Sequence, residues 1–194
     1  MERLFAEDWT LDPKIYDFKG VPPKQFLKGL LAESWEFPTP GTLVVHIRKG
    51  INWQDIPPVS GREFTAYDVE YHYHRLYGLG SGFTKPAPYH GNVSAYKDLI
   101  SVKATDKYTV ILKWKTPNPE FIGETVITVH SPTAAIEARE VVEKWGSLDD
   151  WRHAIGTGPF ILKEFDSGVS ATMVKNPKYW GHDERVPAKP AALR

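Results

Sequence analysis

The sequence contains no cysteine. Disulfide-stapled scaffolds, thiol catalysis and cysteine-ligated metal sites are therefore excluded, although the absence fits reducing and oxidising compartments alike. The chain also lacks an excess of charge, because 24 lysines and arginines balance 24 aspartates and glutamates. A chain without net charge lacks the basic surface that nucleic acids and anionic membranes attract, which argues against both partners.

Long apolar runs are missing as well. No stretch approaches the roughly 20 apolar residues that a transmembrane helix needs. Residues 1–8 place acidic side chains inside a short apolar stretch, which is not the pattern of a signal peptide. Taken at face value, these two absences predict a chain that stays in the cytoplasm.

Aromatic residues, in contrast, are plentiful: 7 Trp, 9 Tyr and 9 Phe in 194 residues. With a hydrophobic fraction of 41%, this composition is typical of a folded globular protein of one domain or one and a half. The rings suit either a large core or aromatic-lined ligand surfaces, and core packing is the commoner use.

Strand and helix patterns follow one another along the chain. Leu43, Val45 and Ile47 alternate with residues that would form a more solvent-exposed face. This pattern predicts a half-buried strand at 42–48, in a hairpin with 31–37. Two further strand pairs are expected, one between 99–105 and 108–114 and one between the two halves of 159–175. Helices are expected at 24–31, 66–77, 131–145 and 148–154, and one more is expected to begin at 116. Strand pairs interleaved with helices indicate an α+β fold with an antiparallel or mixed sheet.

The segment 66–77 supports two interpretations. Thr65 is a good N-cap, Asp68 suits the positive end of a helix, and Gly78 can end one. Apolar and polar residues also alternate between Val69 and the second histidine, which is strand periodicity. The cap and the glycine favour the helix.

The same segment brings His72 and His74 close to Asp68 and Glu70. On a strand the two histidines would share a face and could chelate a metal, whereas on a helix they point in different directions. Helix-surface histidines beside acids are the commoner case, so we expect no metal. The chain also lacks a phosphate loop and a Gly-x-Ser-x-Gly elbow, and we expect no cofactor.

Six segments together carry a resemblance. They are Leu31-Ala-Glu-Ser-Trp-Glu36, the strand 43–48 with Lys49-Gly50, Phe64-Thr-Ala-Tyr-Asp-Val69, Tyr108-Thr-Val-Ile-Leu112 with Thr116-Pro117, Gly156-Thr-Gly-Pro-Phe160 and Asn176-Pro-Lys-Tyr-Trp-Gly181. In order and rough spacing, they resemble the motifs of the family 5 extracellular solute-binding proteins, the peptide- and nickel-type binding proteins of ABC importers. One departure lies at 53–58, where this chain has an insertion in place of the family's His-Asp-Gly turn.

The resemblance implies a periplasmic-binding-protein-like fold of type II, in the group that carries an extra domain. It divides the chain into residues 1–30 as a remnant of lobe one, 31–154 as the extra α+β domain, and 155–194 as a return hairpin toward lobe one. Family members are longer and have two lobes, so we expect this chain to be a fragment without the second lobe.

The resemblance further implies non-catalytic capture of a peptide or related solute and its delivery to the permease of an ABC importer. Such a receptor is expected to be a monomer, periplasmic or extracellular, and membrane-anchored in its full-length form. The expected ligand-facing positions are the loop at 89–90, the segment 126–131 and the turn 156–158. The residues that we expect to contact ligand there are Tyr89, His90, Thr128, His130 and Thr157.

Two other functions stay open from the residues themselves. One is a small hydrolase that acts through histidines and carboxylates around 81–96. Substitution of a catalytic histidine would abolish its turnover, the candidates being His72, His74, His90 and His153. The other is a free-standing interaction module, which a stable dimer burying the aromatic loops would indicate.

Overall fold

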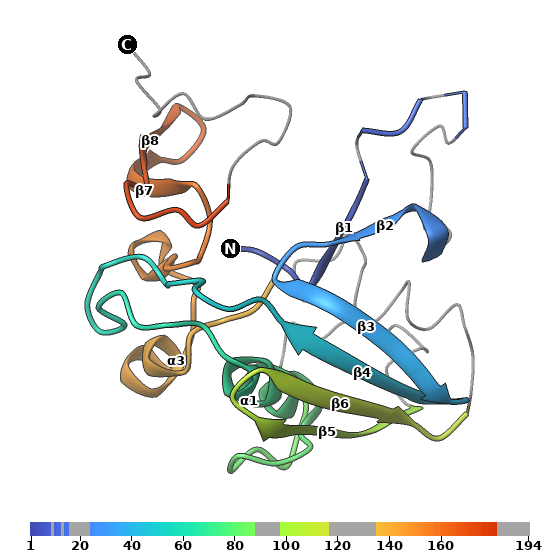
Figure 1. Cartoon of the computed structure of the whole chain (residues 1–194). Helices are drawn as coiled ribbons and strands as arrows, with labels where there is room; N and C mark the ends of the chain where they lie inside the picture. Colours follow the sequence, from blue (N-terminus) through green and yellow to red (C-terminus); the bar gives the residue numbers. More distant parts are fainter. Residues whose placement is uncertain (9, 13, 16–23, 88–97, 117–134, 182–194) are drawn as a thin grey trace.

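The structure is a computed structural model, and it describes all residues except 9, 13, 16–23, 88–97, 117–134 and 182–194 (Figure 1). Three antiparallel sheets and two α-helices make up the regular structure of the described part. In chain order the elements are β1 (Phe5–Glu7), a 3-10 helix (Lys24–Phe26), β2 (Leu27–Gly29), β3 (Ala32–Thr39), β4 (Thr42–Ile47), α1 (Ala66–Tyr77), β5 (Leu99–Asp106), β6 (Thr109–Trp114), α3 (Arg139–Trp145), a 3-10 helix (Trp151–His153), β7 (Phe160–Asp166) and β8 (Ser170–Lys175).

The centre of the molecule is a four-stranded antiparallel sheet in the order β3-β4-β6-β5, with α1 packed against β5 and β6 (Figure 1). Leu43, Val45 and Ile47 are at most 1% exposed, as the alternation in this strand predicts. Trp53, Phe64 and other rings fill the same core, so many of the aromatic residues serve packing. The expected α+β class is confirmed.

Helix α1 runs from Ala66 to Tyr77, as predicted, and the strand interpretation is wrong. The backbone N–H of Thr65 donates to the side chain of Asp68 at 2.9 Å, which secures the first turn. At the other end Gly78 adopts a left-handed conformation with φ of 70°, and its N–H caps the carbonyl of His74. Local signals at both ends therefore outweighed the alternation between them.

The first residues of the chain belong to the structure in a way that the sequence did not indicate. We expected an extended loop and a helix at 24–31, but the helix is only a 3-10 turn that leads into β2, which pairs with β1. Leu4 and Phe5 are buried in the same core as the large sheet. The division of the chain at residue 30 stays a prediction.

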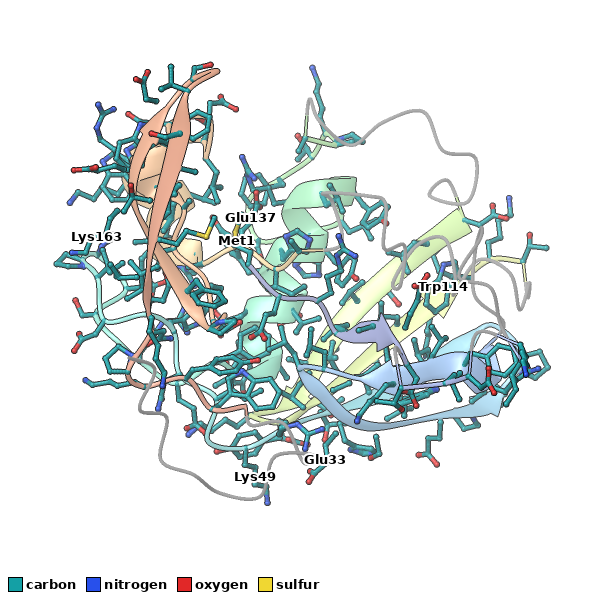
Figure 2. The ribbon with its side chains drawn as sticks, turned by 90° about the horizontal axis from the view of Figure 1, so that it is seen from above. Met1, Glu33, Lys49, Trp114, Glu137 and Lys163 are labelled. Atoms are coloured by element: carbon teal, nitrogen blue, oxygen red, sulfur yellow. The ribbon has the colours of Figure 1, made fainter. Side chains whose placement is uncertain are left out.

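The helix expected at 131–145 is shorter than predicted, since α3 begins only at Arg139. Tertiary contacts hold the described residues before it, which are not helical: the N–H of Ile136 donates to the carbonyl of Glu2 at 3.0 Å. Glu137 pairs with Arg75 of α1 at 2.7 Å. Viewed from above, Met1 and Glu137 lie near each other at this junction (Figure 2). The rest of this prediction, at 131–134, and the helix from 116 lie outside the described residues.

The three predicted hairpins are present, with ends that differ by one or two residues. The short helix expected at 148–154 is a 3-10 turn at Trp151–His153, where the side chain of Asp150 accepts from the N–H of Arg152. The β7–β8 hairpin stands away from the large sheet (Figure 1). Among the helices of the described part, none combines the length and the hydrophobicity that crossing a bilayer requires.

Candidate functional site

The turn Gly156–Gly158, which leads into β7, is the one predicted ligand-facing position that the structure describes. Tyr89, His90, Thr128 and His130 lie outside the described residues. The candidate site therefore consists of Thr157 and the chain segments that meet it.

Gln54 forms hydrogen bonds with both backbone groups of Gly156. Its N–H donates to Oε1 of Gln54 at 3.2 Å, and its carbonyl accepts from the N–H of Gln54 at 2.9 Å. The amide nitrogen of Gln54 donates in turn to the carbonyl of Phe160 at 2.8 Å. A Cβ at position 156 would lie 2.9 Å from the Cα of Met1, so only glycine lets the two backbones approach this closely. The turn is therefore fixed to the segment around Gln54 and lies against the backbone of Met1.

Thr157 is 2% exposed, and its hydroxyl donates to Oε2 of Glu2 at 2.7 Å. The same carboxylate accepts from Nε1 of Trp180 at 3.0 Å and, through Oε1, from the hydroxyl of Tyr179 at 3.0 Å. Burial and the charge of Glu2 raise the pKa of Tyr179, so this phenol stays protonated and keeps donating. We call Glu2, Thr157, Tyr179 and Trp180 the Glu2 cluster.

Asn176 fastens the Asn176–Gly181 motif to this turn, and Arg48 contacts the same motif at Trp180. The side-chain amide of Asn176 donates to the carbonyl of Gly158 at 3.0 Å, and its backbone N–H donates to the carbonyl of Pro159 at 2.7 Å. The guanidinium of Arg48 lies 5.5 Å from the ring centroid of Trp180, within cation–π range. Three separate segments of the chain thus meet at the buried carboxylate of Glu2.

Thr157 therefore contributes its hydroxyl proton to a contact within the protein. Whether this residue also contacts solute stays a prediction. Sequence reasoning missed Glu2 and Gln54 as members of the junction, because neither stands in a recognisable motif. Asn176 could have been found, since it opens one of the two closing motifs.

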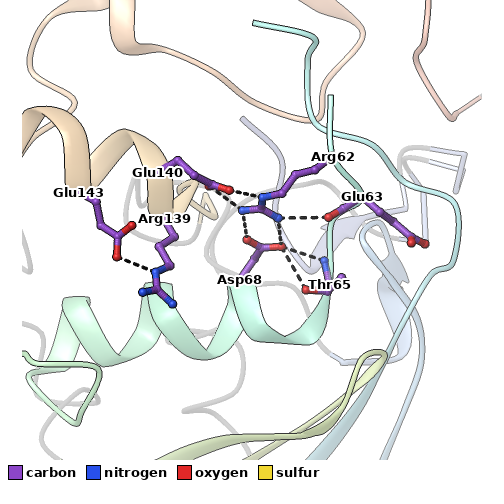
Figure 3. A network of polar contacts seen from close by, with 7 residues as sticks. All are labelled: Arg62, Glu63, Thr65, Asp68, Arg139, Glu140 and Glu143. Atoms are coloured by element: carbon purple, nitrogen blue, oxygen red, sulfur yellow. Dashed lines mark hydrogen bonds and ion pairs between the residues drawn. The ribbon is translucent and has the colours of Figure 1, made fainter. Parts of the chain in front are cut away.

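A second polar network joins α1 to α3 (Figure 3). Arg62 donates to Asp68 at 2.9 and 2.6 Å and to Glu140 at 2.7 Å, with a further contact from Nε to Glu140. Burial opposes the charge of Glu140, but the hydrogen bonds from Arg62 outweigh it and lower the pKa of this carboxyl. Because both carboxylates are engaged by one guanidinium, the network ties two helix starts together and offers no free general base.

The histidines of α1 are separated by the helix. His74 contacts the carbonyl of Val102 at 2.8 Å and the hydroxyl of Ser81 at 2.9 Å. His72 is 1% exposed and lies 3.4 Å from a carboxylate oxygen of Glu137. Within the part of the chain that the structure describes, no three histidine, aspartate or glutamate side chains converge as metal ligands would.

Comparison with known proteins decides the family. The model of the bacterial extracellular solute-binding proteins, family 5 (Middle), matches residues 27–191. The chain belongs to this family. Its members are substrate-binding proteins and not enzymes, so the hydrolase alternative is not favoured.

Relatives agree with this assignment. The di/tripeptide-binding protein 1 of Pseudomonas aeruginosa is 27% identical over 160 residues, which are 79% of this chain and 30% of that protein. The glutathione-binding protein GsiB of Shigella flexneri is 32% identical over 162 residues, or 83% of this chain and 28% of that protein. The solved structure of HbpA2 from Haemophilus parasuis matches with a TM-score of 0.67 at 23% identity, over 92% of this chain and 34% of that one.

The fold comparison confirms the periplasmic-binding-protein-like architecture that the motifs predicted. The chain spans about 30% of the length of the curated relatives that it matches. It therefore contains a portion of the architecture that these receptors have.

Proposed function

We propose that this chain is part of a receptor that captures a peptide or peptide-like solute and delivers it to the permease of an ABC importer, outside the cytoplasm. The observation that carries the proposal is the family match over residues 27–191. The names of the relatives, which bind di- and tripeptides or glutathione, support the solute class.

The Glu2 cluster supports the proposal physically. It joins the segment around Glu2 to the turn at 156–158 and to the motif at 176–181. In two-lobed receptors, ligand is held where the lobes close by hinge motion. We infer that the cluster holds these three segments together during closure, and that the chain alone holds only a part of the ligand contacts.

A thermal-shift titration of the receptor that contains this chain tests the proposal. A ligand at about a hundred times its Kd stabilises a protein by about 2.7 kcal/mol, so di- and tripeptides should raise the melting temperature. The peptides should be recovered intact after prolonged incubation. If the peptides were instead cleaved, and if substitution of His74 or His153 abolished this cleavage, the hydrolase would be established. No shift with peptides or glutathione would contradict the solute class.

A further inference from the structure

The four-stranded sheet ends in two edge strands, β3 and β5 (Figure 1). An edge strand carries backbone groups that can pair with a strand of another molecule, and proteins commonly protect it with charges, proline or bulges. Strand β3 has these features: Glu33, Glu36, Pro38 and two irregularities of register. Strand β5 contains no proline, and its register is regular over 101–104, where Lys103 is the only charged residue. The β5 edge therefore needs another form of protection.

The register identifies the backbone groups that form this edge. The N–H of Trp114 donates to a carbonyl beside the start of β4 at 2.8 Å. Because backbone groups alternate in direction along an antiparallel strand, Leu112 and Val110 also turn theirs toward β4. Val102 and Ala104 of β5 lie opposite these two residues. Their own N–H and C=O groups therefore point away from β6, at the free edge.

The imidazole of His74 covers the middle of this edge. Its Nε2 lies 2.8 Å from the carbonyl oxygen of Val102. A carbonyl oxygen only accepts hydrogen bonds, so Nε2 carries a proton and donates it. The other ring nitrogen, Nδ1, contacts the hydroxyl of Ser81 at 2.9 Å, and the side chain of His74 is only 13% exposed. We call His74, Ser81 and the carbonyl of Val102 the His74 clasp.

The turn that follows α1 is shaped for this contact. The N–H of Phe83 donates to the carbonyl of Gly80 at 2.9 Å, and the ring of Phe83 meets that of Tyr71 on α1 at a centroid distance of 5.6 Å. A Cβ at Gly80 would lie 2.8 Å from Nδ1 of His74, so glycine lets the turn approach the imidazole. Ser81 has φ of 52°, which residues with a side chain rarely adopt. Such a conformation persists where surrounding contacts hold it.

We propose that the His74 clasp is an autoinhibitory contact, which occupies the free edge of β5 and keeps it from pairing with the β5 edge of a second copy of this chain. Two copies related by a two-fold axis would present the same edge to each other and could pair it antiparallel. Val102 lies within the regular part of that edge, so a capped carbonyl there interrupts the ladder. The inference does not depend on the solute that the receptor binds.

Sedimentation velocity of the chain over a concentration series tests this proposal. We expect His74→Ala to strengthen self-association by roughly fivefold to tenfold, the range that one hydrogen bond supplies, while alanine preserves the helix. His74→Gln should stay close to the wild type, because its amide N–H can still donate to the carbonyl of Val102. The matched control is Glu70→Ala, one helical turn earlier: Glu70 lies 4.0 Å from Nε2 of His74 but does not contact the edge through a printed bond of the clasp, so association should not change.

A second substitution locates the association. Ala104→Pro removes an N–H that points to the free edge, so adding it to His74→Ala should restore the wild-type behaviour. If a thermal melt shows His74→Ala to be unfolded, Ser81→Ala replaces it, with a smaller increase expected because only the hydroxyl contact is lost. Equal association of His74→Ala and Glu70→Ala would overturn the proposal. Association that Ala104→Pro leaves unchanged would overturn it too, and so would a wild-type chain that dimerises until Ala104→Pro is introduced.

Discussion

Replacing Gly78 by alanine is expected to lower the free energy of unfolding by about 3 kcal/mol. Gly78 ends α1 with φ of 70°, a conformation that costs a residue with a side chain about 1 kcal/mol. The larger effect is steric, because a Cβ there would lie 2.6 Å from the carbonyl carbon of Lys85 and 2.8 Å from its nitrogen. Backbone cannot rotate away as a flexible side chain can, so the loop must shift, at about 1–3 kcal/mol.

The matched control for this substitution is Gly50→Ala. Gly50 has nearly the same backbone conformation, with φ of 75°, but a Cβ there would meet no atom within 4 Å. Its loss should be only about 1 kcal/mol, from conformation alone. Urea unfolding followed by tryptophan fluorescence measures both variants. Equal losses at the two glycines would show that the close approach at Lys85 does not contribute.

Removal of the Glu2 side chain is expected to cost about 3 kcal/mol or more as well. Glu2→Ala leaves the buried hydroxyl of Thr157 and the indole N–H of Trp180 without their acceptor, and it leaves a void. Each unsatisfied buried group costs about 1–3 kcal/mol. The hydroxyl of Tyr179 loses its partner too. The same unfolding measurement gives the loss.

Glu2→Gln separates hydrogen bonding from charge. A glutamine oxygen can accept from Thr157 and Trp180, while its amide donates to the hydroxyl of Tyr179, which can turn to accept. We therefore expect a loss of only about 1 kcal/mol, the typical difference between a charged and a neutral hydrogen bond. Glu33→Ala, at an exposed position of β3, should have almost no effect. If Glu2→Ala lowered the free energy of unfolding as little as Glu33→Ala, the Glu2 cluster would not contribute to the stability of the junction.

Much of the fold could be predicted where the signals are local. The cap at Thr65 and the glycine at 78 fixed both ends of α1, and the alternation in 42–48 gave the buried side of β4. Each hairpin was marked by two apolar runs around a short turn. Strand β1 was missed because three residues are too few to show any alternation.

The errors and omissions have a common physical cause, namely contacts between residues far apart in the sequence. The carbonyl of Glu2 binds the N–H of Ile136, and residues 135–138 are not helical although a helix was predicted there. Glu2 and Thr157 are 155 positions apart, so no window of sequence could join them. The motifs predicted that the turn at 156–158 matters. Only the fold shows that the hydroxyl of Thr157 is directed at the buried carboxylate of Glu2.

The most direct test of the proposed receptor is native mass spectrometry of the product of this gene, purified from its own host. We expect a polypeptide heavier than 22.0 kDa that carries a noncovalent adduct of peptide mass, released intact on collisional activation. The mass of the released molecule would then identify the solute. A product of 22.0 kDa that stays free of ligand when di- and tripeptides are added would contradict the proposal.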